Sequence, residues 1–260
     1  MVFPTFFLFG VIIGSFLNVV ICRLGTGETL LGRSQCPHCK KTLAWCELVP
    51  LFSFLAQWGK CRSCRTRISA QYPLVELLTG ALFVSVAQSF PSDRVLLALN
   101  LVLVSLLIVI AVYDLRHLII PDTLVLLLLA LAGTQVFWRD ADVPDALLGG
   151  FIPAAFLGGL WLISRGRWLG FGDAKLVFPL GLIVGFLGSI SLLVFSFWIG
   201  AVVSVGVLFT QRLLRGQQFF SIRTPRFTMK SEVPFAPFLI CAFLLVHLFG
   251  ADLFALVDFH

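Results

Sequence analysis

The stretch WLGFGDAK, residues 168–175, is the part of the sequence from which we interpret the rest. It places the carboxylate of Asp173 and the ammonium group of Lys175 where a long hydrophobic run begins, directly after two closely spaced glycines. An acidic residue at such a boundary either caps a helix or carries a function in the membrane. A second carboxylate at an equivalent boundary elsewhere in the chain favours the functional interpretation.

The composition of the chain excludes an ordinary soluble protein. Of its 260 residues, 59% are hydrophobic and only 12% are charged, and the mean hydropathy is +1.01. A soluble domain has roughly 25% charged residues. We therefore expect an all-α polytopic membrane protein. The net charge of +6 then reflects an asymmetry between loops, and no nucleic-acid partner is expected.

Hydrophobic runs predict about eight transmembrane helices. Each run is close to the roughly 20 residues that a helix needs to cross a bilayer. Residues 3–21 have no positive charge before them and Arg23 after them, so they predict a retained helix with its N-terminus outside. Asn18 is expected to form a hydrogen bond between helices, because it would be costly in lipid. The later runs are 73–90, 95–113, 122–137, 145–163, 174–188, 190–209 and 233–250.

Loop charges predict the orientation in the membrane. If residues 22–72 are cytoplasmic, all of the 19 Lys and Arg residues except Arg94 and Arg139 fall on the cytoplasmic side. This bias is the positive-inside pattern. The outer acidic residues are expected to be solvated; they are Asp93, Asp140, Asp142 and Asp145.

Residues 22–72 form the sizeable polar region of the sequence and contain two Cys-x-x-Cys pairs. The four thiolates can close a tetrahedral zinc site, and they indicate a reducing compartment. His38 is expected to face solvent, and the other three cysteines are expected to pack. The predicted organisation is a first transmembrane helix (1–21), a cytoplasmic zinc-binding insert (22–72) and a helical membrane domain (73–260). The predicted zinc ligands are Cys36, Cys39, Cys61 and Cys64, and the packing cysteines are Cys22, Cys46 and Cys241.

The second boundary carboxylate is Asp114, in YDLRHLIIPD (113–122). Two carboxylates from different helices at one membrane depth can share a proton, so that one activates water and the other protonates a peptide carbonyl. We expect the proton mainly on Asp114, which ends a helix, because Asp173 begins one beside Lys175. Gly170 and Gly172 would let an extended substrate approach this pair closely.

These pieces together resemble a known family, the type IV prepilin leader peptidases, also called prepilin peptidase/N-methyltransferases. The similarity extends in family order from the first predicted span to the last. The matching motifs are GSFLNVVICRL (14–24), CPHC (36–39), GKCRSCRTRISAQYPLVE (59–76), DLRHLIIPD (114–122), GFGDAKL (170–176) and PFAPFL (234–239).

The resemblance implies a multi-pass aspartic endopeptidase of the bacterial inner membrane, with its active site facing the cytoplasm. It would remove the short basic leader of type IV prepilins or pseudopilins of type II secretion, cutting after a Gly. It would then methylate the new N-terminal residue with S-adenosylmethionine. The motif match assigns catalysis to Asp114 and Asp173, an active-site loop to Gly170, Gly172 and Lys175, and structural zinc to the four cysteines. It also makes Gly59 a candidate for the methyltransferase function of the insert.

Smaller expectations concern residues around these motifs. Ala236 stands where the family more often has Gly, and it is not expected to touch the catalytic pair. Asp122 is expected to cap the helix that follows Pro121. Membrane lipid headgroups and four inner acidic residues are candidates to attract a basic leader. The four residues are Glu28, Glu47, Glu76 and Glu232.

Two other classes of protein remain open at this point. Presenilin-type and signal-peptide-peptidase-type proteases also pair a YD with a GxGD aspartate, but they lack an N-terminal insert with paired cysteine knuckles. A transporter could use two intramembrane acids to carry a coupling ion. Such folds often contain inverted repeats, and none is visible here.

Overall fold

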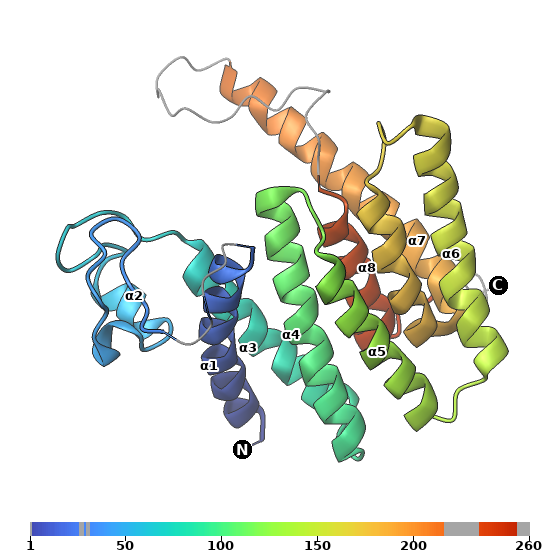
Figure 1. Ribbon diagram of the computed structural model, residues 1–260, viewed down its shortest axis with the longest axis horizontal. Helices are drawn as coiled ribbons and strands as arrows, with labels where there is room; N and C mark the ends of the chain where they lie inside the picture. Colours follow the sequence, from blue (N-terminus) through green and yellow to red (C-terminus); the bar gives the residue numbers. More distant parts are fainter. Residues whose placement is uncertain (1, 26–28, 30–31, 216–233, 254–260) are drawn as a thin grey trace. The chain divides into compact units, whose positions relative to one another are not determined.

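Helices are the main regular elements in the residues that the computed structural model of the protein describes, which are 2–25, 29, 32–215 and 234–253 (Figure 1). Two isolated β-bridges are the other regular pairings in these ranges. The chain divides into two compact units, Met1–Tyr113 and Asp114–His260. The expected all-α fold is confirmed.

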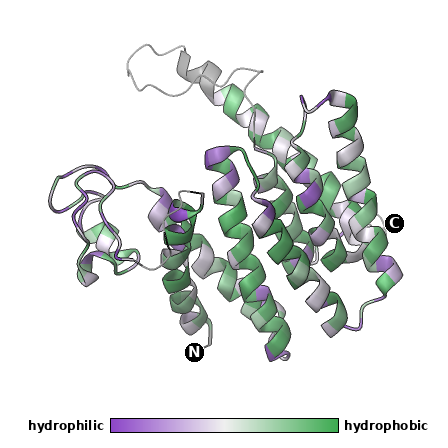
Figure 2. Ribbon diagram, viewed as in Figure 1, coloured by the Kyte–Doolittle hydropathy of each residue, from purple (hydrophilic) through white to green (hydrophobic). Residues whose placement is uncertain are grey.

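Within the described ranges, five helices are long and apolar enough to cross a membrane, and two shorter ones are also apolar. The protein is therefore a multi-pass membrane protein. Figure 2 shows that hydrophobic residues cover the long helices, while hydrophilic residues gather in the insert and near helix ends. The exact number of eight spans stays a prediction. The five long helices are Phe3–Arg23, Gln71–Ser89, Arg94–His117, Val143–Ser164 and Phe171–Thr210.

In the first unit, α1 (Val2–Arg23) packs closely against α3 (Gln71–Ser89). A Cβ atom added to Gly10 would lie 2.8 Å from the Cα of Gly80, so the two backbones meet without intervening side chains. Small residues allow this close approach between membrane helices. Asn18 is buried, and its Nδ2 donates to the carbonyl of Tyr72 at 3.2 Å. The expected hydrogen bond between helices is therefore confirmed.

The insert contains two short helices, η1 (Trp45–Glu47) and α2 (Phe52–Ala56). It is followed by α3 and then by α4 (Arg94–His117). The start of α4 is capped by Asp93, whose Oδ1 accepts the backbone N–H of Val95 at 2.8 Å. Asp93 therefore has a capping role beyond the solvation that the sequence predicted.

The second unit is built around α7 (Phe171–Arg215). This helix packs against α5 (Asp122–Trp138), α6 (Val143–Ser164) and α8 (Ala236–Phe249). Glycines again allow the closest approach, because a Cβ atom on Gly149 of α6 would collide with the backbone of Gly181 of α7. The α7 helix thus holds the unit together and carries Asp173 in its first turn.

The α7 helix is two segments joined at Gly185, whose φ of 75° and ψ of −176° are not helical. Two ring contacts show that the first segment runs opposite to α6. Phe151 lies 4.9 Å from Phe178, and Trp161, later in α6, lies 5.0 Å from Phe171, earlier in α7. The sequence predicted separate spans at 174–188 and 190–209, whereas the break falls at Gly185 and the first segment already begins at Phe171.

The second segment of α7 runs in the same direction as α6 and is therefore antiparallel to the first. Just after the break, the N–H of Phe186 donates to Asp145 near the start of α6 at 3.3 Å. Further along, Phe197 lies 6.4 Å from Phe156 of α6. Figure 1 shows the resulting hairpin of the two segments beside α6.

Two charged side chains satisfy the backbone where α7 breaks. The guanidinium of Arg139 donates to the carbonyl of Ile183 at 3.3 Å, and Asp145 accepts the N–H of Phe186. Each charge therefore meets the helix pole that favours it. The expectation that Asp145 is merely solvated is wrong, because periodicity along the chain does not show that its carboxylate meets a helix start 41 residues later.

Candidate active site and cysteine cluster

Asp114 and Asp173 are both buried, and they lie close enough for the charge of Asp114 to act on Asp173. Both belong to the second unit, in which Asp114 is the first residue. Their positions follow from helix ends, because Asp114 lies in the last turn of α4 and Asp173 in the first turn of α7. The fold thus brings together two carboxyl groups that are 59 residues apart in the sequence.

Asp173 is held by its own turn. Its Oδ2 accepts the backbone N–H of Gly170 at 3.2 Å. This bond satisfies an amide at the start of α7, where a negative charge is also favoured by the helix dipole. The local GxGD sequence therefore fixes the orientation of this carboxylate.

Asp114 receives a hydrogen bond from the backbone N–H of Ala236, at the start of α8. Its Oδ2 is buried, and no donor reaches that oxygen from the residues that the structure describes. The expectation that Ala236 does not touch the pair is therefore wrong. The PFAPFL motif carried a usable signal, since a proline near its start is typical of a helix N-terminus, which presents unpaired N–H groups.

The two glycines of the GxGD turn have different surroundings. A Cβ atom on Gly172 would lie 3.2–3.3 Å from three atoms of Ile120, so the absence of a side chain lets Ile120 pack there. A Cβ atom on Gly170 would have only an ordinary contact, 3.5 Å from Asp173 Oδ2. Space at Gly172 is therefore occupied by the protein itself, whereas Gly170 leaves more room for a substrate backbone.

Lys175 does not bond to the carboxyl pair. Its Nζ donates to Asp122 Oδ1 at 2.8 Å and lies 5.0 Å from the ring centre of Phe171. Asp122 is the first residue of α5, directly after the N-cap residue Pro121. Its negative charge complements the dipole at the start of that helix, and its ion pair with Lys175 joins the starts of α5 and α7.

The four predicted zinc ligands form one cluster. The sulfur atoms of Cys36, Cys39, Cys61 and Cys64 all lie within 4.8 Å of one another, and Cys36 Sγ is 3.8 Å from Cys64 Sγ. Tetrahedral zinc with bonds of about 2.3 Å requires sulfur separations of about 3.8 Å. All seven cysteines lie in the described ranges, and each is a free thiol there. The arrangement fits structural zinc, which would be held by these four thiolates.

The two Cys-x-x-Cys turns have the same backbone geometry. In each, the amide of the first cysteine bonds to the carbonyl five residues later, as in Cys36 to Lys41 at 3.0 Å and Cys61 to Thr66 at 2.9 Å. Lys40 and Arg65, which follow the second cysteines, both have positive φ, near 57° and 58°. Short antiparallel bridges then close both turns. Because the two turns have the same geometry, each directs its two sulfur atoms toward a common centre.

The surroundings of Cys64 favour its thiolate. Its sulfur lies 3.3 Å from the hydroxyl of Thr66, and this hydrogen bond lowers the pKa of the Cys64 thiol to about 6. A deprotonated thiol is the form that binds a metal ion. Cys22 and Cys46 lie outside the cluster, and Cys22 Sγ is 3.6 Å from the hydroxyl of Tyr72.

Gly59 has a clear backbone role at the end of α2. Its φ is +64°, and its N–H bonds to the carbonyl of Phe54 at 2.9 Å. The carbonyl of Gly59 then accepts the N–H of Ile68 at 2.7 Å. A glycine here closes a helix in a left-handed conformation, so the turn explains the residue type independently of any cofactor.

The inner acidic residues are partly engaged by the protein. Glu76 is buried and accepts the N–H of Leu51 at 2.8 Å, and Glu47 accepts the N–H of Ala44 at 2.9 Å. Both carboxylates are therefore engaged in hydrogen bonds within the insert and its neighbouring helix. Glu28 and Glu232 lie outside the described residues.

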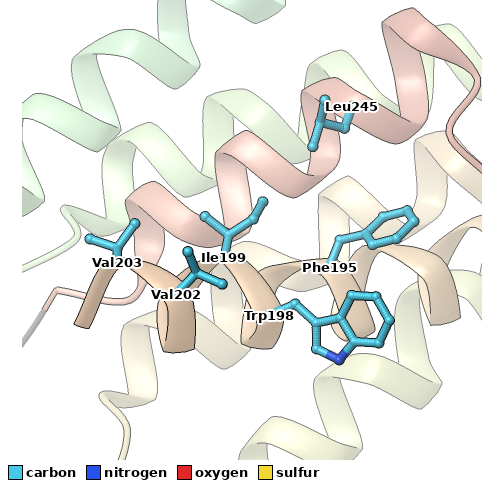
Figure 3. Close-up of a pocket in the computed structure, with 6 residues that line it drawn as sticks. All are labelled: Phe195, Trp198, Ile199, Val202, Val203 and Leu245. Carbon is cyan, nitrogen blue, oxygen red and sulfur yellow. The ribbon is translucent and has the colours of Figure 1, made fainter. Parts of the chain in front are cut away.

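An open apolar groove lies between the second segment of α7 and α8 (Figure 3). Its lining side chains are apolar apart from the indole N–H of Trp198, and none of them is an acid or a base. The groove is therefore distinct from the carboxyl pair. On a membrane protein such a surface suits hydrocarbon. Its lining residues are Phe195, Trp198, Ile199, Val202, Val203 and Leu245.

Comparison with known proteins decides the family. A family described as bacterial peptidase A24 N-terminal domain matches residues 8–90, and the type IV leader peptidase family matches residues 101–205. A prepilin leader peptidase/N-methyltransferase from Bacillus subtilis is 34% identical over 94% of this chain and 93% of its own length. The chain belongs to the type IV leader peptidase family.

Other relatives of this family carry the same description. The protein from Myxococcus xanthus is 39% identical over 78% of this chain and 62% of its own length. The protein from Aeromonas hydrophila is 33% identical over 95% of this chain and 91% of its own length. No solved structure matches the chain. Membership of the type IV leader peptidase family makes the protein an enzyme and argues against the transporter interpretation.

Proposed function

We propose that this family member is an aspartic endopeptidase that removes the short basic leader of prepilins or pseudopilins, after a Gly, at the cytoplasmic face of the inner membrane. The observation that carries the proposal is the buried proximity of Asp114 and Asp173. Two adjacent buried carboxyl groups cannot both be ionised at low cost, so they share one proton. A shared proton is what water activation by one carboxylate and carbonyl protonation by the other require.

The roles of the two residues follow from their hydrogen bonds. Asp173 accepts the Gly170 amide at the start of α7, which suits an ionised carboxylate that orients water. Asp114 has a buried oxygen with no partner among the described residues, and an ionised oxygen in that position would be costly. We assign the proton to Asp114 on the ground of that unpartnered oxygen, although the N–H of Ala236 favours an ionised Asp114.

The orientation follows from the loop charges. The N-terminus is placed outside, and the insert and the carboxyl pair are placed on the cytoplasmic side, because most Lys and Arg residues then lie inside. Part of that count, including Arg223, Arg226 and Lys230, lies outside the described residues.

We also propose that the insert supports N-methylation of the new N-terminal residue, with Gly59 as a candidate position. S-adenosylmethionine would supply the methyl group to the amine. The cysteine cluster would hold the fold of the insert through zinc, which in such sites contributes folding free energy directly.

The test is cleavage of a purified prepilin by the detergent-solubilised protein, with and without S-adenosylmethionine, followed by mass spectrometry of the product. A loss equal to the leader mass supports the peptidase, and a further methyl increment supports the second activity. Asp114→Asn and Asp173→Asn should each abolish cleavage while methylation of an already cleaved pilin persists. Asp140→Asn, an exposed aspartate, is the matched control. Full cleavage by either of these two variants of the carboxyl pair would refute the catalytic assignment.

A further inference from the structure

One short segment of the insert exposes large apolar side chains. Trp45 and Trp58, at its two ends, are 82% and 88% exposed, and Phe52 and Leu55 between them are 73% and 70% exposed. Exposed apolar residues concentrated in this way mark an interaction surface. The segment Trp45–Trp58, which we call the aromatic segment, comprises η1, the following turn and α2.

The apolar residues between the two tryptophans are exposed as well. Leu48, Val49, Phe52 and Leu55 are all exposed, although they belong to α2 and to the turn between η1 and α2. In a soluble domain such side chains would be buried in a core, whereas here they face outward.

The attachment of the aromatic segment places it at the membrane boundary. The N–H of Leu51, in the turn between η1 and α2, donates to Oε2 of Glu76 at 2.8 Å. Glu76 is buried in α3, a membrane-crossing helix that begins at Gln71. At 1.5 Å per residue, Glu76 lies about 8 Å along that helix. The segment is therefore held beside the first turns of a transmembrane helix.

The backbone supports the same position. Leu51 has a φ of 61°, which is unfavourable for a residue with a side chain. A residue holds such a conformation when its surroundings impose it. Here the N–H of Phe52 donates to the carbonyl of Pro50 at 2.6 Å across Leu51, and the Leu51 N–H is held by Glu76. The insert is also tethered at both ends, because α1 precedes it and α3 follows it, and both cross the membrane.

The charges of the insert complement an anionic surface. Between residues 32 and 70 the sequence contains one acidic residue, Glu47. Clusters of basic residues next to a membrane helix are attracted by anionic lipid headgroups. The basic residues in this range are Arg33, Lys40, Lys41, Lys60, Arg62, Arg65 and Arg67.

We propose that the aromatic segment inserts its exposed side chains into the headgroup boundary of the bilayer that the chain's own helices cross. Tryptophan prefers this boundary because its ring is amphipathic, and the apolar face of an interfacial helix enters the bilayer by about 5–10 Å. The proposal does not rest on the proposed peptidase activity, since it needs only the membrane-crossing helices. Because Cys61 follows Trp58 closely, the cysteine cluster is thereby held near the bilayer surface.

The test is site-specific photo-crosslinking of the full chain in vesicles of phosphatidylethanolamine and phosphatidylglycerol. Benzoylphenylalanine replaces Trp45, Phe52 or Trp58 one at a time, and His38, exposed in the first cysteine turn, is the control position. After illumination, mass spectrometry identifies what each position has captured. A zinc content equal to that of the unmodified protein shows that each variant has folded.

The expected result is a several-fold higher yield of lipid adducts at positions 45, 52 and 58 than at position 38. A lipid yield at those three positions no greater than at position 38 overturns the proposal. Adducts with a second copy of the chain, or with added prepilin in place of lipid, also overturn it and assign the surface to that partner. A variant of Asp114 or Asp173 that no longer cleaves prepilin should give the same yield of lipid adducts. The two proposals can therefore fail independently.

Discussion

Lys175 Nζ lies 2.8 Å from Asp122 Oδ1, and this ion pair joins the first turns of α7 and α5. Both residues are close in sequence to the carboxyl pair, since Lys175 follows Asp173 by two positions. The side chains are partly exposed, at 38% for Lys175 and 70% for Asp122. The pair is therefore suited to positioning the start of α7, not to the chemistry itself.

Breaking this ion pair should reduce the turnover of cleavage modestly. Exposed pairs contribute roughly 0.2–1 kcal/mol, so we expect Lys175→Met and Asp122→Asn each to lower kcat by up to about fivefold, with KM nearly unchanged. The exchange Asp122→Lys with Lys175→Asp should restore part of the loss. Complete loss of cleavage in Lys175→Met would show that Lys175 acts directly on the substrate or on the carboxyl pair.

Removing the backbone donor at position 236 should weaken the site more strongly. Proline at this position abolishes the N–H that reaches Asp114, while the first turn of a helix tolerates its ring. Asp114 becomes ionised when it gives its proton to the substrate carbonyl, and hydrogen bonds to charged groups are worth about 1.5–3 kcal/mol. We therefore expect Ala236→Pro to lower kcat by roughly 10- to 100-fold. Ala236→Gly keeps the N–H and is the matched control. Equal kcat values for the two variants, at equal Tm, would exclude a role for this amide.

The break in α7 should tolerate no side chain at Gly185. Its backbone conformation is open essentially to glycine alone, and a Cβ atom there would also collide with Asp145 Oδ2. We expect Gly185→Ala to destabilise the second unit by about 1–3 kcal/mol or more, seen as a lower Tm in detergent. Gly206→Ala lies in the same helix with no atom within 4 Å of the added Cβ and should leave Tm unchanged or slightly higher. Similar Tm values for both variants would contradict this account of the break.

The cysteine cluster should bind one zinc ion per chain. Cys39→Ser or Cys61→Ser should release the metal and make the insert more sensitive to limited proteolysis, while the membrane helices stay folded. Cys46→Ser, outside the cluster, should keep both the metal and the resistance. Acidification should also release zinc, because protons compete for the thiolates. Elemental analysis of protein purified without chelators measures this directly, and the absence of stoichiometric zinc would refute the prediction.

Local sequence patterns predicted the features that depend on neighbouring residues. Hydrophobic runs located the helices, and the spacing within CPHC and CRSC identified four cysteines that the fold does bring together. The role of Asn18 followed from the cost of an amide in lipid. These features could be predicted from the sequence because each depends on residues within one helix or one turn.

Features that depend on tertiary contacts could not be predicted from local sequence patterns. Nothing near Ala236 in the sequence shows that its amide reaches Asp114, and nothing near Asp145 shows that it caps the N–H of Phe186. A glycine inside an apolar run can equally well be helical, so the run alone did not place the reversal at Gly185. Only the packing of α6 and α8 against α7 decides these contacts.

The short segments of the second unit have a consequence for the lipid around them. Phe171–Val184 is about 21 Å long at 1.5 Å per residue, and the 14 residues of α8 have the same length. A typical hydrocarbon core is about 30 Å thick. Where a helix is shorter than the core, the bilayer thins toward it. Acyl-chain length is therefore a variable that should govern how easily water reaches Asp114 and Asp173 from the aqueous phase.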